Sequence, residues 1–207
     1  MARRIEVHPQ DPQRRLLEQA ASALEHGGVI AYPTDSSYAL GWSMGDKAAL
    51  DQVRRIRRTE TDHDFTLVCR DLSEIATYAR VDNSAYRLLK ALTPGPYTFI
   101  LRATSELPKR LQDAKRKSIG IRVPENRITQ VLLETVGKPI MSSTLLLPDE
   151  DLPLTDPEDI ADRIGSQVEL ILDGGAGGLQ PTTVLDLTGG DVKIVRRGKG
   201  PVDLFEP

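Results

Sequence analysis

This sequence has one cysteine and three histidines in 207 residues, and aromatic residues make up only 4% of it. The lone cysteine, Cys69, excludes an intramolecular disulfide, and its place in the apolar run 65–69 favours a small core residue over a nucleophile. The three histidines, His8, His26 and His63, are scattered and match no zinc-ligand spacing. The shortage of aromatic rings argues against a protein that stacks the bases of single-stranded nucleic acid.

Long apolar segments are also missing. No run approaches the roughly 20 residues that a membrane-spanning helix needs, and the basic N-terminus MARRIEVHPQ lacks the apolar stretch of a secretory signal. Hydrophobic residues at 39% and charged residues at 28% are ordinary for a soluble globular protein. We therefore expect a cytoplasmic protein without a membrane partner.

Three common catalytic motifs are absent. The sequence contains no G-x-x-x-x-G-K-[ST] loop, no G-x-G-x-x-G after its first apolar strand and no G-x-S-x-G elbow. These absences argue against P-loop enzymes, Rossmann-type dehydrogenases and α/β-hydrolases.

Helical and strand periodicities alternate along the whole chain, which predicts a single α/β domain over residues 1–207. Helices are expected over residues 16–24, 47–58, 72–79, 84–92, 127–136 and 157–165. Strands are expected over residues 29–32, 65–69, 97–102, 118–123, 139–146, 168–172, 183–187 and 192–196. Several links near the C-terminus are too short to hold a helix, so antiparallel pairs and a mixed sheet are expected.

The stretch YPTDSSYALG (32–41) is the most informative part of the chain. Pro33 ends an apolar strand, and Thr34, Asp35, Ser36 and Ser37 follow it. Polar groups at the carboxyl end of an apolar strand are typical of a ligand site in an α/β protein. They are equally typical of a capped turn in which Thr34, Asp35 or Ser36 begins a short helix. These residues alone leave both alternatives open.

Other polar side chains interrupt or end apolar strands in the same way. They are Thr98, Arg122, Ser142, Ser143, Thr144, Thr182, Thr183, Arg196 and Arg197. Arg122 needs a partner in so apolar a strand, and that partner is either a structural carboxylate or a ligand. Hydroxyls with several arginines suit a pocket for an anionic ligand such as a nucleotide. Since no carboxylate–histidine pair is spaced for proton transfer, any catalysis should rest on positioning and charge neutralisation.

Charge is distributed unevenly. Residues 1–127 hold 21 Lys and Arg against 16 Asp and Glu, whereas residues 128–207 hold 6 against 14. The basic half contains two clusters, made of Arg54, Arg55, Arg57 and Arg58 and of Lys109, Arg110, Lys115, Arg116 and Lys117. Such clusters are either solvated faces or a surface for a polyanion. The candidate RNA-binding residues are Arg54, Arg55, Lys109, Arg110, Lys115, Arg116 and Lys117.

Five motifs occur here in the order seen in the YrdC/YciO family. They are YPTDSSYALG (32–41), TPGPYTFIL (93–101), IGIRVP (119–124), PTTVLDLTG (181–189) and IVRRG (194–198). The chain resembles this family from about residue 10 to 200, and the segments FTLVCRDLSE (65–74) and DAKRKSIGIRVP (113–124) resemble its YciO branch most.

The resemblance implies a twisted mixed α/β sheet with flanking helices and a large concave basic cavity, the YrdC/RibB-like fold. Characterised members join ATP, threonine and bicarbonate into threonylcarbamoyl-AMP for the t6A modification of tRNA, with Mg²⁺ expected beside ATP. Double-stranded RNA or tRNA binding has also been proposed for the fold. By resemblance, Thr34, Arg122, Thr144 and Thr182 would contact the threonine or carbamate. Arg57 or Arg58, Arg196 and Ser142 would contact the nucleotide.

Two signatures of the synthases are altered. Synthases carry K-x-R where residues 57–59 are RRT, and S-x-N where residues 144–146 are TLL. A histidine expected after the first signature falls on Val68. Arginine is not equivalent to lysine at a close phosphate contact, and leucine offers no hydrogen bond, which costs roughly 1–3 kcal/mol at a buried contact.

Three functions remain open from the sequence. The chain is a nucleotidyltransferase of the threonylcarbamoyl-AMP synthase type, an RNA-binding protein without that activity, or a protein for another nucleotide or anion. The enzymatic account depends on one spatial expectation, which is that Thr34, Arg122, Thr182 and Arg196 converge on one pocket. The sequence predicts no oligomeric state.

Overall fold

The computed structural model describes residues 2–58, 65–113 and 115–205. Ten strands form one sheet in the order β1-β8-β2-β3-β7-β4-β6-β5-β9-β10. The strands are β1 (Arg3–Glu6), β2 (Ile30–Pro33), β3 (Tyr38–Ser43), β4 (Thr66–Val68), β5 (Tyr97–Arg102), β6 (Ser118–Arg122), β7 (Ile140–Thr144), β8 (Leu170–Asp173), β9 (Thr183–Asp186) and β10 (Lys193–Arg196).

The helices follow the local signals of the sequence. They are α1 (Arg14–Glu25), α2 (Lys47–Arg57), α3 (Leu72–Tyr78), α4 (Asn83–Leu92), α5 (Arg127–Val136) and α6 (Pro157–Ile164), with short 3₁₀ helices η1 (Lys109–Leu111) and η2 (Asp203–Phe205). The Asp46 carboxylate caps α2 by accepting a hydrogen bond of 2.9 Å from the backbone N–H of Ala49. Gly137 ends α5 in the left-handed conformation, with φ of 73°.

Parallel and antiparallel pairs occur in the same sheet, so the prediction of a mixed α/β sheet is confirmed. β8 lies parallel to both β1 and β2, and β5 lies parallel to β9. The short connection from β9 to β10 gives an antiparallel pair, as its length predicted.

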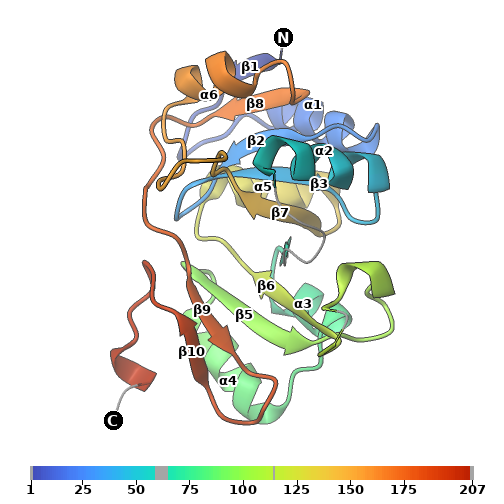
Figure 1. The fold of residues 1–207 in the computed structure, drawn as a ribbon, viewed down its shortest axis with the longest axis vertical. Helices are drawn as coiled ribbons and strands as arrows, with labels where there is room; N and C mark the ends of the chain where they lie inside the picture. Colours follow the sequence, from blue (N-terminus) through green and yellow to red (C-terminus); the bar gives the residue numbers. More distant parts are fainter. Residues whose placement is uncertain (1, 59–64, 114, 206–207) are drawn as a thin grey trace.

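The helices cover both sides of the sheet. One core lies against β1, β2 and β8. It contains Leu17 and Leu24 of α1 together with Ile128 and Leu132 of α5. A second core holds residues of α2, α6, α3 and α4. Figure 1 shows β1, β8, β2, β3 and β7 with α1, α2, α5 and α6 in the upper half, and β6, β5, β9 and β10 with α3 and α4 in the lower half.

Two strands were not predicted. β1 is an edge strand with the sequence RRIE, in which only Ile5 is buried, so its hydrophobic pattern is too sparse to detect. β3 pairs antiparallel with β2, with Pro33 opposite Tyr38. Residues 34–37 therefore form a hairpin turn, and the alternative of a short helix begun by Thr34, Asp35 or Ser36 is wrong. None of the helices in the described residues is long and apolar enough to cross a bilayer.

Candidate functional site

An open pocket of about 890 Å³ is lined by residues of both halves of the sheet. Its floor is one row of neighbours across four strands. Ser142 on β7 pairs with Thr66 on β4, Thr66 pairs with Gly120 on β6, and Gly120 pairs with Ile100 on β5. All four line the pocket. The small side chains on three of these strands leave the volume above the sheet open.

The β2–β3 turn forms one wall and is organised by Thr34. The Thr34 hydroxyl donates to the carbonyl oxygen of Ser37 at 2.7 Å and accepts from the backbone N–H of Ser36 at 3.1 Å and of Ser37 at 3.2 Å. Thr34, Ser36 and Ser37 are buried. These local bonds fix the turn, and Thr34 and Ser37 line the pocket.

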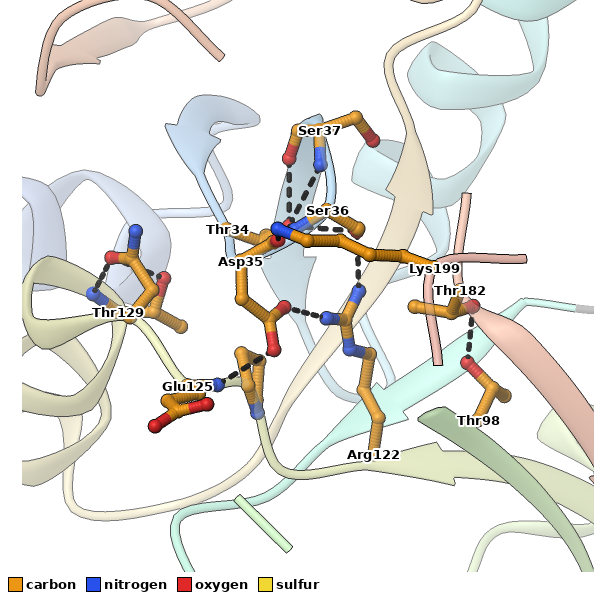
Figure 2. A network of polar contacts seen from close by, with 12 residues as sticks. Thr34, Asp35, Ser36, Ser37, Thr98, Arg122, Glu125, Thr129, Thr182 and Lys199 are labelled. Carbon is orange, nitrogen blue, oxygen red and sulfur yellow. Dashed lines mark hydrogen bonds and ion pairs between the residues drawn. The ribbon is translucent and has the colours of Figure 1, made fainter. Parts of the chain in front are cut away.

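Arg122 at the end of β6 is held beside this turn by a buried ion pair (Figure 2). Its guanidinium binds the carboxylate of Asp35, and its Nη1 donates to the Ser36 hydroxyl at 3.2 Å. The other Asp35 oxygen accepts from the backbone N–H of Glu125 at 2.8 Å. Arg122 is 8% exposed, and its Nε is buried without a hydrogen-bond partner in the described residues. The arginine is thus a structural partner of Asp35 that also lines the pocket and keeps one donor unused.

A second polar cluster comes from β5, β10 and the residue that precedes β9. The hydroxyls of Thr98 and Thr182 lie 2.9 Å apart. Arg196 donates to the carbonyl oxygen of Thr182 from Nε at 3.1 Å and from Nη2 at 3.0 Å. Burial lowers the pKa of Arg196 below its ordinary value, and the positive charge of Arg122 lowers it further. A bound anion would therefore favour the charged form of Arg196.

Arg57 enters the pocket from the end of α2. It donates from Nη1 to the Ser143 hydroxyl at 2.5 Å and from Nε to the carbonyl oxygen of Leu146 at 3.3 Å. Burial lowers the pKa of Arg57 as well. Arg57 is thus a third guanidinium of the same pocket, and with Arg196 the second whose pKa is lowered by burial.

Ser142 and Thr144 line the pocket from β7. The Ser142 hydroxyl lies 2.7 Å from the hydroxyl of Tyr32, a residue with no exposed surface. Burial raises the pKa of Tyr32 to about 12, although the bond to Ser142 acts in the opposite direction. Tyr32 therefore stays neutral at physiological pH and holds the Ser142 hydroxyl in place.

The basic clusters are divided by the fold. Lys109, Arg110, Lys115, Arg116 and Arg54 line the pocket. Arg110 reaches the carbonyl oxygen of Gly45, and Arg116 pairs with Asp186 at 3.0 Å.

Arg55, Arg58 and Lys117 do not line the pocket. The Arg58 side chain is 75% exposed and lies 3.5 Å from Asp149, while Arg55 donates to Gln52. The alternative that Arg58 replaces Arg57 at the site is thus not supported by the geometry.

Sequence reasoning missed several residues of the site. Thr66 and Gly120 lie inside predicted strands, and only the pairing of those strands reveals that they share the pocket floor. Lys199 donates to the carbonyl oxygen of Asp35 from the far end of the chain (Figure 2). Its position in the basic, glycine-flanked stretch RRGKG was the only signal available.

Thr34, Arg122, Thr182 and Arg196 all line one pocket, as the spatial expectation required. Eight basic and two acidic residues line it in the part of the chain that the structure describes. That part holds no group of three or more His, Cys, Asp and Glu placed to bind a metal ion. Cys69 is buried, with a thiol pKa raised chiefly by burial, so it is a core residue. Chemically, the pocket is suited to an anion that carries hydrogen-bond acceptors.

The family model named Sua5/YciO/YrdC and described as "Telomere recombination" matches residues 22–198. The chain is 53% identical over 199 residues to the uncharacterised protein YciO of Escherichia coli K12, which covers 96% of this chain and 97% of that protein. The crystal structure of E. coli YciO matches all of both chains with a TM-score of 0.95 at 51% identity.

More distant relatives carry named activities or ligands. A threonylcarbamoyl-AMP synthase of Vibrio vulnificus strain YJ016 is 30% identical over 164 residues, covering 78% of this chain and 87% of the synthase. The structure of P. abyssi Sua5 complexed with L-threonine matches with a TM-score of 0.88 at 24% identity, covering 97% of this chain and 59% of Sua5. At that identity the match to Sua5 shows a shared fold.

Proposed function

The chain belongs to the Sua5/YciO/YrdC family, and on that premise we propose that its pocket binds a nucleotide together with a threonine-like small molecule. We propose further that the chain is a nucleotidyltransferase that forms threonylcarbamoyl-AMP from ATP, threonine and bicarbonate for the t6A modification of tRNA. In this proposal residues 1–207 act as one domain in the cytoplasm, where these substrates occur, and the pocket is the concave basic cavity of the family.

One observation carries the proposal. The same pocket is lined by three guanidiniums from separate elements, those of Arg57, Arg122 and Arg196. The hydroxyls of Thr34 and Thr182 line it as well. Burial lowers the pKa of both Arg57 and Arg196, so a bound anion would favour the charged form of both side chains. Phosphate and carboxylate groups are the ligands that guanidiniums bind best.

We divide the ligand among the pocket residues according to its chemical groups. We assign the phosphates to Arg57 and Arg196, and the adenylate contact to Ser142. The threonine and its carbamate are assigned to Thr34, Arg122, Thr144 and Thr182. Arg122 is already neutralised in part by Asp35, so its unused Nε would contribute one directed hydrogen bond rather than a full countercharge.

The chemistry needs no general base at the transfer step. A carbamate oxygen, already ionised, forms a bond to the α-phosphorus of ATP while the bond from that phosphorus to the bridging oxygen breaks and diphosphate leaves. Negative charge moves onto the diphosphate, and Arg57 and Arg196 would stabilise it there. The described residues that line the pocket include no histidine, which agrees with this division of labour.

Mg²⁺ fits only as a companion of ATP. Of the carboxylates in the described residues, Asp113 and Asp151 line the pocket, and no metal-binding group of three or more His, Cys, Asp and Glu forms there. Mg²⁺ commonly binds through substrate phosphates and water with few protein ligands. We therefore derive no step of the reaction from a protein-bound metal.

The altered signatures predict slow turnover. Arg57 stands in place of lysine and Leu146 in place of asparagine, while Thr59 lies outside the described residues. The histidine position is taken by Val68, which is fully buried. Each lost contact in the transition state lowers the rate by about 10- to 100-fold.

Threonine-dependent release of diphosphate from ATP in the presence of bicarbonate tests the proposal. We expect turnover above a heat-killed control and a decrease of about tenfold or more in Arg196→Gln. Arg87→Gln, on the exposed side of α4, is the matched control and should leave the rate unchanged. Wild-type protein that releases no more diphosphate than the heat-killed control would remove the synthase proposal.

A double-stranded RNA- or tRNA-binding protein without synthase activity is the second candidate. The exposed side chains of Lys109, Arg110, Lys115 and Arg116 gather at the pocket, which is a suitable place for phosphate-backbone contacts. Such binding should weaken steeply as the salt concentration rises. Replacing all four residues with Gln should reduce the slope of the log of the association constant against the log of the salt concentration by about three. A gel shift at low salt without a complex would remove this candidate.

A further inference from the structure

The edge of the sheet formed by β1 is open to an additional strand. β1 stands at one end of the strand order, and its residues Arg3, Arg4 and Glu6 are exposed. Figure 1 shows it in the upper half of the molecule, at the end of the sheet far from β5, β9 and β10. Edge strands carry unpaired backbone donors and acceptors, which can bind a further strand.

The contacts of β1 with β8 show which of its backbone groups point outward. The N–H groups of Arg3 and Val7 donate at 3.4 and 2.8 Å to carbonyl oxygens in residues 169–173. In a parallel pair, alternate residues bond to the neighbouring strand. The odd-numbered residues of β1 therefore bond to β8, whereas the N–H and C=O groups of Arg4 and Glu6 point away from the sheet.

The side chains of β1 alternate between the two faces of the sheet. Ile5 and Val7 are buried in the core that also contains residues of α1 and α5. On the other face, Arg4 Nε lies 3.5 Å from the Asp173 carboxylate with 44% of the arginine side chain exposed, and Glu6 is exposed too. One exposed cation and one exposed anion thus share a face, at the two positions whose backbone groups point outward.

A second copy of this chain fits the charge pattern of β1. Two copies related by a two-fold axis pair antiparallel at such an edge, and opposite residues then share a face. The outward backbone groups allow the axis to pass through Arg4, Ile5 or Glu6. An axis at Arg4 or at Glu6 places like charges opposite each other, which is destabilising. An axis at Ile5 instead places Arg4 of each copy opposite Glu6 of the other.

The opposite edge of the sheet, β10, lacks these properties. Its register with β9 shifts between Ile194 and Arg196, and its charged residues, Lys193 and Arg196, are both basic. Irregular pairing and like charges protect an edge from a further strand. β1 pairs with β8 in one unbroken register and carries charges of both signs. Charge therefore opposes self-pairing at β10 and favours it at β1.

We propose that β1 is the interface of a homodimer, in which the β1 strands of two copies pair antiparallel about Ile5. Each pair of Arg4 and Glu6 exchanges both backbone hydrogen bonds and adds an ion pair, and the two sheets become continuous. The inference goes beyond the proposed function and does not depend on it. Neither β1 nor β8 lines the pocket, so both pockets of the dimer stay open.

The strength of the dimer follows from the length of the strand. β1 has four residues, so the contact area is small and a weak association is expected. The expected dissociation constant is on the order of 10–100 µM. Sedimentation equilibrium of the whole chain over about 1–500 µM covers this range and should show wild type passing from monomer to dimer.

Charge reversal tests the register. Glu6→Arg places arginine opposite arginine, and Arg4→Glu places glutamate opposite glutamate, so each variant alone should dimerise at least about tenfold more weakly than wild type. An equimolar mixture of the two restores unlike charges at both positions and should form a heterodimer. Glu106→Arg, which makes the same charge change at an exposed residue after β5, is the matched control and should dimerise as wild type does.

A proline variant separates strand pairing from charge attraction. Glu6→Pro removes an outward N–H and leaves the hydrogen bonds between β1 and β8 in place. It should weaken dimerisation, and a mixture with Arg4→Glu should not recover it. Circular dichroism and urea unfolding check that each variant is folded.

Three results would overturn the inference. The first is a wild-type protein that stays monomeric over the whole concentration range. The second is unchanged dimerisation in Glu6→Arg and Arg4→Glu, which would place the contact elsewhere. The third is a mixture of these two variants that dimerises no better than either alone, which would contradict the pairing about Ile5.

Discussion

The Nε of Arg57 donates a hydrogen bond of 3.3 Å to the backbone carbonyl oxygen of Leu146. These two residues stand at two of the positions where the chain departs from the synthase signatures, and they contact each other although 89 positions separate them in the sequence. Arg57 also donates to the hydroxyl of Ser143, so its guanidinium is bonded both to β7 and to the loop that follows β7. The two departures are therefore neighbours in space, and the contact uses the backbone of Leu146 rather than its side chain.

This proximity predicts that Arg57→Lys with Leu146→Asn raises synthase turnover by about 10- to 100-fold, since a compact ammonium and an amide would replace the two altered contacts. Each single variant should gain less than about threefold, because neither supplies both groups. Threonine-dependent diphosphate release measures the effect, with the folded state of each variant checked by circular dichroism. A double variant no faster than wild type would show that these two positions do not limit the rate.

The buried pair of Asp35 and Arg122 predicts a large loss of stability in Arg122→Met. This change leaves a carboxylate that is 8% exposed without its guanidinium, which costs about 3–5 kcal/mol of the free energy of unfolding. Urea unfolding at pH 7 measures it, and Asp35→Asn added to Arg122→Met should recover part of the loss. Arg58→Met breaks an exposed pair and should cost less than about 1 kcal/mol. Equal losses in Arg122→Met and Arg58→Met would contradict this account.

The pocket floor predicts that a large side chain at Gly120 blocks ligand binding. A Cβ there would lie 3.3 Å from Thr98 Cγ2 and 3.6 Å from Thr66 Oγ1, so Gly120→Ala should fit with a small adjustment. Gly120→Leu projects further into the pocket and should weaken ATP binding at least about tenfold, as measured by calorimetry. Gly189→Leu serves as the control, because a Cβ at Gly189 meets nothing within 4 Å. Unchanged ATP affinity in Gly120→Leu would place the ligand elsewhere.

Tyr32 predicts a loss of stability at alkaline pH. Its pKa is raised from 10.0 to about 12 by burial, so between these values the unfolded state loses the phenol proton while the folded state keeps it. The free energy of unfolding therefore falls as pH rises through this window, by about 2–3 kcal/mol from Tyr32.

Urea unfolding at pH 9 and pH 11.5 measures this dependence. Tyr32→Phe should show a smaller decrease between the two pH values than wild type, since phenylalanine has no proton to lose. Part of the decrease should remain, because burial also raises the pKa of Tyr38. The exposed Tyr86 provides the control variant Tyr86→Phe, in which the wild-type decrease should persist. An identical decrease in Tyr32→Phe and wild type would contradict the assignment.

Local signals predicted most helices and strands. The cap at Asp46 and the glycine at Gly137 act within a few residues, so the sequence states their effect directly. β1 was not predicted because this edge strand buries only Ile5 and so carries little apolar pattern. β3 was not predicted because it forms a strand through pairing with β2 and β7, and its sequence does not alternate between apolar and polar residues.

The sequence predicted which types of residue form the site but not which of them contact each other. The sequence required a partner for Arg122, because burying an unpaired guanidinium is too costly. It did not name Asp35, which lies 87 positions away. It left Arg57 and Arg58 as equivalent candidates, whereas the left-handed backbone at Arg58, with φ of 46°, takes that residue out of α2 and toward solvent.

The sequence by itself determined the α/β class, the helix ends, the family and the need to neutralise a buried arginine, because these follow from each residue and its near neighbours. Only the tertiary structure decided which hydroxyls and guanidiniums share a pocket and that Thr66 and Gly120 form its floor. Those facts depend on strand order and register, and many distant segments must pair before either is fixed.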